Sequence, residues 1–320
     1  MYCQEPLTLC YNKFMKFQDK HPILLGSLAA LTCESLFGLS YLFTKSATSQ
    51  SSPLALLGWR FLLAFLFMQL LVTLGWVKLT IQGKSLGQLV KISFFSPVLY
   101  FIGETFGIKM TTASESGAFL ATIPVIALMA SSILLREKPN RHQVMGIGLT
   151  LVGVLFTVFA LGLSASFSIP GYLMLILAVI GYAFYSVHVE KATAFSGADM
   201  TYLMLLVGGL VFPILALVEA VLKHQLYELL LLPIRHQAFS IAVLYQALAC
   251  SVIAFFLSNF AIAKIGVNKA ASFIGVSTLV SILAAVLFLG EAFSQYQTFG
   301  AFLIILGVYL SNIPIKQNKP

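Results

Sequence analysis

The chain contains an internal repeat, because residues 104–156 return in weakened form as residues 258–310. The two copies align without a gap at an offset of 154 positions. The informative matches are Glu137 with Glu291, Gln143 with Gln297, Gly146 with Gly300, and Gly153 with Gly307. Leucine matches arise by chance in an apolar chain, but a glutamate, a glutamine and two glycines at fixed spacing do not. Two halves built on one plan are typical of secondary transporters when the chain is a membrane protein.

The composition supports a membrane protein. Of the 320 residues, 59% are hydrophobic and only 9% are charged, and the mean hydropathy is +0.95. A soluble domain usually has about a quarter of its residues charged, which it needs for a solvated exterior. This chain lacks those charges, so we expect an all-α integral membrane protein with many spans.

Apolar stretches long enough to cross a bilayer, roughly 20 residues each, occur ten times. They are 22–44, 53–75, 89–108, 112–135, 142–163, 169–189, 200–222, 237–262, 267–289 and 296–315. The third span is the weakest, since Lys91 and Glu104 lie near or within it.

The distribution of basic residues predicts the orientation of these spans. With a cytoplasmic N-terminus and ten crossings, fourteen of the 19 Lys and Arg residues fall on the cytoplasmic side. Positive residues accumulate in cytoplasmic loops of membrane proteins. We therefore expect a multi-pass protein of the cytoplasmic membrane with both termini in the cytoplasm.

Five spans in each half is an odd number, so the second copy enters the membrane from the opposite side. The sequence thus predicts ten transmembrane helices in two inverted five-helix repeats around a central cavity. The expected divisions are a cytoplasmic tail, a first repeat, a second repeat and a second cytoplasmic tail: 1–21, 22–163, 164–315 and 316–320.

Other function classes find little support. The net charge of +8 comes from short clusters and forms no basic stripe, so we expect no nucleic-acid partner. No P-loop, HExxH or GxSxG motif is present, and no cysteine spacing suggests a metal site. We expect no cofactor, no metal and no enzymatic activity. An intramembrane enzyme would need a nucleophile–base pair or a metal cluster at depth, and a receptor would not need inverted halves.

Several motifs resemble those of a known family. Residues 36–45, LFGLSYLFTK, resemble the first-span element of EamA-type carriers in the drug/metabolite transporter superfamily, with Phe37 where tryptophan is usual. Ser52-Pro53 followed by Trp59-Arg60-Phe61 resembles the start of their second span. The other elements that resemble the family are Ala113-Ser114, Pro124-Val125 and Arg136-Glu137 of its fourth span and Gly146 and Gly153 of its fifth, with Leu289-Gly290-Glu291, Gly300 and Gly307 as their second copies.

The resemblance covers about residues 22 to 312. It implies ten helices in two repeats, a central cavity, and small metabolites as substrates, often amino acids or related compounds. Thr278 stands where the second copy would carry its proline, and Glu34 and Glu104 lie outside the family pattern. The substrate itself does not follow from the resemblance.

Glu34 is the first candidate binding residue, because it lies near the middle of the first span. A charge at this depth costs roughly 2.5–3.5 kcal/mol on insertion scales, so it should face the bundle interior or a watery cavity. It can bind a substrate ammonium group or couple transport to protons. The alternative is a neutral carboxyl group that is hydrogen-bonded within the bundle.

Two tyrosines precede polar residues by one helical turn. Tyr100 and Glu104 share a helix face, which would suit a cationic or aromatic substrate, although a boundary ion pair of Glu104 with Lys109 is an alternative. Tyr185 and His188 end the sixth span. His188 either responds to protons or caps the helix near the interface.

Three further polar residues lie in or near spans. Arg60 either snorkels to the external interface, which we favour, or pairs with a substrate carboxylate. Gln246 and Asn259 in the eighth span can hydrogen-bond to substrate or to neighbouring helices. Glu137 and Glu291 lie at helix ends, where we expect structural roles.

The repeated glycines share one face of the fifth and tenth spans. Close helix contact or formation of a homodimer is the ordinary use of such a face. The leading prediction is a secondary transporter that moves a small metabolite by alternating access, with the lipid bilayer and a small molecule as partners. A multidrug-type exporter is the alternative.

Overall fold

The computed structural model describes residues 21–111, 113–159, 168–289 and 295–313, and these residues form helices and connections without a strand. The helices of the first half are α2 (Pro22–Gln50), α3 (Pro53–Thr73), α4 (Gly87–Ser93), η1 (Phe94–Leu99), α5 (Tyr100–Met110), α6 (Ala113–Leu120), α7 (Ile123–Leu134) and α8 (Arg141–Phe159). Those of the second half are α9 (Ile169–Lys191), α10 (Gly197–Leu222), α11 (Leu226–Arg235), α12 (Gln237–Tyr245), η2 (Gln246–Ala254), α13 (Phe255–Ile265), α14 (Val267–Ser272), α15 (Ile274–Leu289) and α16 (Gln295–Ser311).

Each predicted apolar range is helical over most of its described residues. Seven helical stretches in the described parts of the chain are long and apolar enough to cross a membrane. Two further apolar stretches, α7 and residues 141–156 of α8, are shorter than these seven. Residues 1–20 of the predicted tail 1–21, the whole predicted tail 316–320, and Gly290 and Glu291 lie outside the described residues.

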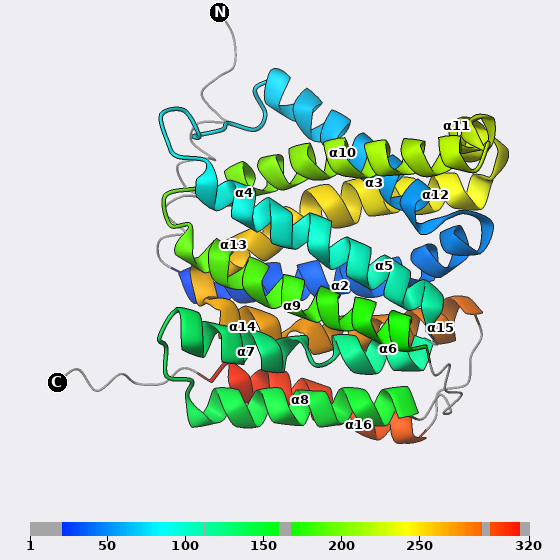
Figure 1. The fold of residues 1–320 in the computed structure, drawn as a ribbon. Helices are drawn as coiled ribbons and strands as arrows, with labels where there is room; N and C mark the ends of the chain where they lie inside the picture. The colour runs from blue at the N-terminus through cyan, green and yellow to red at the C-terminus, as the bar shows by residue number, and fades with distance from the viewer. Residues whose placement is uncertain (1–20, 112, 160–167, 290–294, 314–320) are drawn as a thin grey trace, which may run out of the picture.

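Residues 223–236 lie between two predicted spans, and the structure shows a helix, α11, at 226–235 within them. α11 has leucines at several adjacent positions and carries the strongest separation of polar and apolar faces among the helices. At ten residues it is too short to cross a bilayer. It lies at one end of the bundle (Figure 1), next to α10 and α12.

Serine residues define where two of the long helices begin. The Ser52 hydroxyl oxygen accepts a hydrogen bond from Ala55 N at 3.0 Å, and Pro53 occupies the first turn of α3. The Ser196 hydroxyl oxygen accepts from Asp199 N at 3.1 Å, and the Asp199 carboxylate accepts from Ser196 N at 2.9 Å. Such caps satisfy backbone N–H groups that have no partner inside the helix.

The long helices lie in layers with their axes in a broadly common direction (Figure 1). α8 and α16 pack along each other at the lower edge of that view, α3 and α10 pack together near the upper edge, and α2 runs between them. α2 contacts α13 and α15, whereas α9 contacts α5 and α7. Helices of the first half are therefore packed mainly against helices of the second half.

Glycines allow α8 and α16 to approach closely. A Cβ atom on Gly146 would lie 2.5 Å from the carbonyl oxygen of Gly307, and one on Gly153 would lie 2.7 Å from that of Gly300. Both distances are too short for real side chains, so the predicted glycine face is occupied within the chain. A homodimer through this face is not needed to explain it.

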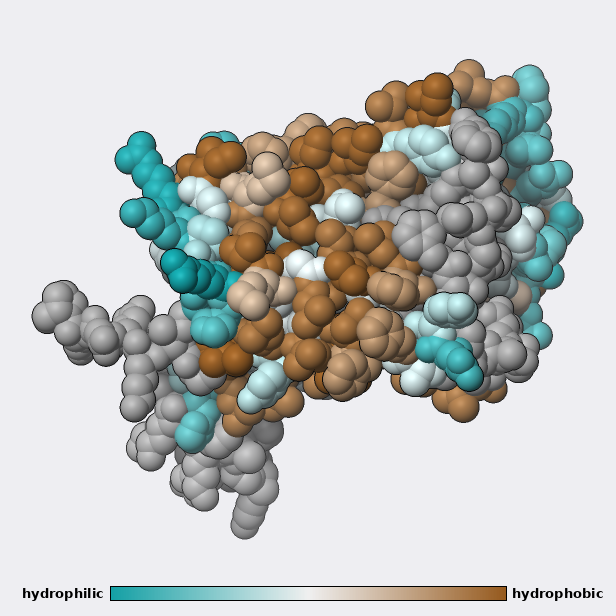
Figure 2. Space-filling view, turned by 90° about the horizontal axis from the view of Figure 1, so that it is seen from below, coloured by the Kyte–Doolittle hydropathy of each residue, from teal (hydrophilic) through white to brown (hydrophobic). Residues whose placement is uncertain are grey.

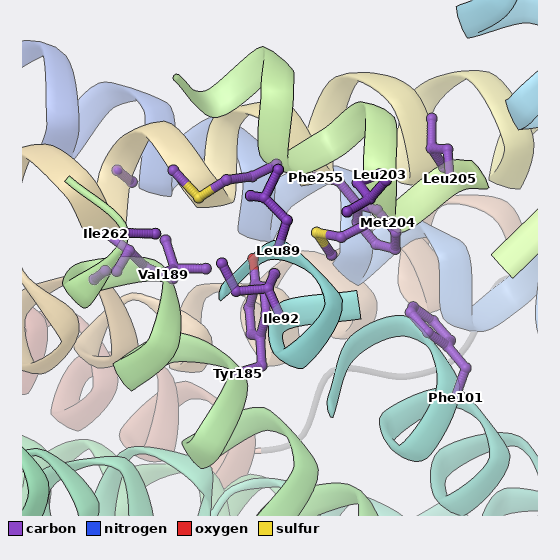
Figure 3. Packing of buried hydrophobic residues seen from close by; sticks show 14 of the residues in the cluster. Leu89, Ile92, Phe101, Tyr185, Val189, Leu203, Met204, Leu205, Phe255 and Ile262 are labelled. Carbon is purple, nitrogen blue, oxygen red and sulfur yellow. The ribbon is translucent and has the colours of Figure 1, made fainter. Parts of the chain in front are cut away.

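The surface has the polarity that lipid requires. Figure 2 shows hydrophobic residues across the middle of one face and hydrophilic residues at its two ends. Large apolar side chains with half or more of their area exposed include Ile133, Leu173, Leu222, Ile234, Leu287 and Phe302. The interior is also apolar, and Figure 3 shows Leu89, Ile92, Val189 and Ile262 packed together there.

Candidate substrate-binding cavity

A cavity lies between the helices and encloses about 760 Å³, counting its open mouth. Its walls combine aromatic, aliphatic, small polar and charged side chains from α2, α3, η1, α5, α6, α7, α9, α13 and α15. The lining residues that matter below are Glu34, Phe37, Arg60, Tyr100, Phe101, Glu104, Tyr182, Tyr185, Phe255 and Ser258. Figure 3 shows Phe101, Tyr185 and Phe255, which come from three different helices.

The helical path is irregular beside this cavity. η1 and η2 are wider than α-helix and occupy corresponding places in the third and eighth predicted spans. Within η1, Ser96 leaves the helical conformation (φ −144°, ψ 122°) and lines the cavity. Insertions of this kind inside helices are frequent at functional sites because they re-aim side chains.

Arg60 is buried, and the expectation that it snorkels to the interface is wrong. Its side chain is 4% exposed and lines the cavity. The Nε group donates to Ser251 Oγ at 2.8 Å, and Nη1 donates to Gln246 Oε1 at 3.3 Å. The guanidinium carbon lies 4.4 Å from the centre of the Phe101 ring. These groups from η2 and α5 hold the guanidinium inside the bundle.

One nitrogen of this guanidinium has no partner. Nη2 is enclosed and donates to no hydrogen-bond acceptor among the described residues. A buried donor without an acceptor costs about 1–3 kcal/mol, and more when the group is charged. The sequence did contain a signal for this residue, since an arginine seven positions into an apolar span lies deep unless it snorkels.

Glu34 projects from α2 into the same cavity and is only 7% exposed. Its carboxyl group makes no hydrogen bond and no ion pair with any part of the chain that the structure describes. The alternative prediction for Glu34, a carboxyl group that is hydrogen-bonded within the packed bundle, is therefore wrong for the described structure.

Glu104 and Tyr100 meet as their spacing predicts. The Tyr100 hydroxyl donates to Glu104 Oε1 at 2.7 Å, and both residues line the cavity. The alternative ion pair with Lys109 is not formed, because the one salt bridge among the described residues joins Lys223 to Glu219. Lys109 is exposed at the end of α5.

Tyr185 connects the cavity to a buried polar network. Its hydroxyl donates to Asn259 Oδ1 at 2.7 Å and lies 3.3 Å from Ser258 Oγ. The Asn259 amide nitrogen donates in turn to Thr201 Oγ1 at 3.0 Å. Asn259 is thus a wall residue behind the cavity, and Tyr185 forms the surface.

Gln246 and His188 also lie off the cavity surface. Gln246 accepts from Arg60 and donates to Thr44 Oγ1 at 2.9 Å. The Nδ1 atom of His188 lies 2.7 Å from Phe184 O, and its ring lies 5.3 Å from that of Phe95. The structure therefore brings Glu34, Tyr100, Glu104 and Tyr185 into one cavity and leaves His188 outside it.

No cluster of three or more His, Cys, Asp or Glu residues that could hold a metal occurs in the described ranges. Cys33 and Cys250 are buried free thiols. Each donates weakly to a backbone carbonyl, of Ala254 and Leu36 respectively. Both behave as small apolar residues in helix packing.

A bundle of apolar helices around a polar cavity defines a membrane transporter, and comparison with known proteins gives the family. The EamA-like transporter family model matches residues 24–159 and again residues 169–313. The chain belongs to this family. It is a multi-pass membrane protein of the cell membrane, with a small-molecule substrate and the bilayer as its partners.

Relatives along nearly the full length carry transporter names. The uncharacterized transporter YcxC of Bacillus subtilis (strain 168) is 31% identical over 300 residues, covering 93% of this chain and 96% of that protein. A probable amino-acid metabolite efflux pump of Salmonella typhimurium is 23% identical over 287 residues, covering 88% and 93%. One solved crystal structure has a TM-score of 0.71 and 17% identity, and covers 89% of this chain and 96% of that one. At that identity it shows a shared fold alone.

Proposed function

We propose that this protein is a secondary transporter that moves a small metabolite, an amino acid or a related compound, across the cytoplasmic membrane. It works by alternating access between two inverted five-helix repeats, 22–163 and 164–315. The observation that carries the proposal is the central cavity, which both halves line. Within the described residues, the Glu34 carboxyl group and Arg60 Nη2 have no hydrogen-bond or ion-pair partner there. Unpaired charged groups at this depth are expensive and belong to a transport pathway.

The cavity lining supports the inverted repeat. Four pairs of lining residues are separated by 154 positions, the same offset that aligns the two sequence copies. They are Phe101 with Phe255, Glu104 with Ser258, Leu120 with Ile274, and Ile123 with Ser277. Equivalent positions of two repeats meet at one place when a two-fold axis passes through it.

The contact of α8 with α16 supports the same axis. Gly146 approaches Gly307, and Gly153 approaches Gly300. In the sequence alignment, however, Gly146 corresponds to Gly300 and Gly153 to Gly307. The contacts are therefore crossed, which is the arrangement that a two-fold axis between antiparallel copies produces.

The lining also favours a state that is open toward one side. It extends along α2 to Thr44 and along α5 to Ile108, near the ends of these helices that we place outside the cell. Toward the opposite end, Leu89, Ile92 and Val189 fill the bundle. Rocking one repeat against the other would close the first path and open the second.

An amino acid or related solute fits a cavity with both signs of charge. The Salmonella typhimurium relative bears the name of an amino-acid metabolite efflux pump, which adds to this choice. The second candidate is a multidrug-type exporter, favoured by the aromatic rings of Phe37, Phe101, Tyr182 and Phe255. We place substrate contacts on Glu34, Tyr100, Glu104 and Tyr185, with Gln246 and Asn259 as supports and no direct contact for His188.

The test is transport by the purified protein in liposomes, with labelled amino acids, nucleoside-type metabolites and a lipophilic dye cation, with and without a pH gradient. We expect saturable flux of at least one amino acid and none in empty vesicles. Flux of the dye cation alone would favour the multidrug alternative. Flux that is equal in empty vesicles would refute the carrier.

Glu34→Gln tests the cavity itself. We expect flux to fall about tenfold, because a charge-assisted hydrogen bond to a cationic group contributes about 1.5–3 kcal/mol. Glu228→Gln is the matched control, since Glu228 is exposed on α11 outside the cavity. Unchanged flux in Glu34→Gln would remove Glu34 from the binding site.

A further inference from the structure

We infer that Arg60 is the anion-binding residue of the cavity and that the transported solute carries a single carboxylate, bound at its guanidinium. The inference rests on the proposed function and goes further by naming the group that is recognised and the residue that recognises it. The role of Arg60 is inferred from its surroundings in the structure.

Three contacts orient the guanidinium, and they leave its Nη2 atom without a hydrogen-bond acceptor among the described residues. Nε is occupied by Ser251 and Nη1 by Gln246, while one face of the group lies against Phe101. Gln246 is itself fixed by its donation to Thr44 Oγ1 at 2.9 Å. The edge that carries Nη2 is the part of Arg60 without a partner among the described residues.

Nη2 is also closed off from water in this conformation. An empty site therefore leaves part of a cationic group with neither solvent nor an acceptor, which is unfavourable. A carboxylate is the acceptor whose planar geometry matches the guanidinium edge. Arg60 lies in the cavity wall, so a shift of its guanidinium toward the cavity would bring Nη2 within reach of a solute that supplies that acceptor.

The protein does not supply the acceptor itself. Glu104 lines the same cavity, but its Oε1 atom accepts from Tyr100, and it forms no ion pair with Arg60 in the described structure. Glu34 likewise makes no ion pair there. Arg60 and Glu104 attract each other electrostatically, but no salt bridge among the described residues occupies Nη2, which is left for a ligand.

The balance of charge in the lining selects the class of solute. Among the described lining residues, one guanidinium faces two carboxyl groups, those of Glu34 and Glu104. A phosphate dianion would bring two negative charges to a single guanidinium, whereas a solute with one carboxylate and one ammonium group matches one guanidinium and a carboxyl acceptor. The ammonium group would then bind at Glu34, so the solute is a small zwitterion.

The experiment measures binding to the purified protein for matched solute pairs. The pairs are L-phenylalanine with 2-phenylethylamine, L-leucine with 3-methylbutylamine, and L-lysine with 1,5-diaminopentane, in which the second compound lacks only the carboxylate. We expect at least one amino acid to bind about tenfold or more tightly than its amine, the size of effect expected for a charge-assisted hydrogen bond.

Two variants locate this discrimination. Arg60→Lys keeps the charge but removes the planar fork. Gln246→Glu places a carboxylate beside Nη1, so that the protein itself neutralises Arg60. We expect both to reduce the preference for the amino acid to about twofold or less. Lys109→Gln is the control. It removes an exposed positive charge in the last turn of α5, outside the cavity lining, and should leave the preference unchanged.

Equal binding of amino acid and amine by the unaltered protein would overturn the assignment, as would full preference in both Arg60→Lys and Gln246→Glu. Flux of a solute without a carboxylate, together with no binding of any amino acid in the panel, would also overturn it while leaving the transporter proposal intact. Absence of flux for every solute would instead count against the proposed function.

Discussion

Tyr185 and Asn259 form the most extensively bonded pair in the cavity wall. Replacing Tyr185 with phenylalanine removes the donor to Asn259 Oδ1 while nearly keeping the shape. A buried carbonyl oxygen without its donor costs about 1–3 kcal/mol. We therefore expect Tyr185→Phe to lower the melting temperature of the purified protein measurably.

Tyr309→Phe provides the control for this change. Tyr309 is 70% exposed on α16, so loss of its hydroxyl should leave the melting temperature almost unchanged. An equal loss of stability in both variants would show that the Tyr185–Asn259 hydrogen bond does not stabilise the protein.

The positions of charged residues in the apolar spans predicted only some of the residues that line the cavity. Glu34 and the Tyr100–Glu104 pair could be predicted because a charge at bilayer depth has few places to go. Arg60 could not be assigned, since a long side chain near a span end can either snorkel or turn inward, and the choice depends on partners in η2 far along the sequence. His188 had a suitable position in the sequence, but its ring packs against Phe95.

The pair formed by α8 and α16 makes a prediction at the level of helices. A Cβ atom at Gly153 would lie 2.7 Å from a backbone carbonyl oxygen of α16, and backbone cannot move aside easily. We expect Gly153→Ala to destabilise the protein by about 1–3 kcal/mol, as overpacked contacts do. Thermal unfolding in detergent measures the effect.

Gly148 on the same helix is the matched control. Nothing lies within 4 Å of a Cβ atom built there, so Gly148→Ala should be neutral or stabilising by up to about 1 kcal/mol through helix propensity. Equal melting temperatures for Gly148→Ala and Gly153→Ala would contradict the close packing of these two helices.

Helix positions were the most predictable part of the fold. Runs of about 20 apolar residues must be helical in lipid, because no water is available for the backbone. The interruptions were not predictable. η1, η2 and the break between α6 and α7 depend on contacts between distant helices, and α11 consists of too few residues to register as a span.

For the molecule as a whole, the proposed inverted repeat predicts which loops share a compartment. Single cysteines replacing Lys138 and Glu291, in a chain whose four native cysteines are replaced, should react with a membrane-impermeant maleimide from opposite sides. We expect position 291 to react in intact cells and position 138 only in inside-out vesicles, because five predicted spans separate the two positions. Reaction of both positions from the same side would exclude the inverted arrangement.

Both halves of the chain line the cavity, but its charged groups come from one of them. In the described lining, Glu34, Arg60 and Glu104 all belong to the first half, and the position equivalent to Glu104 is the neutral Ser258. If the two halves are the inverted repeats that we propose, divergence between them has made the charge of the cavity one-sided. A chain rebuilt from two identical first halves would keep the container but double its charges, and a solute with one positive and one negative group would no longer have a single way to lie within it.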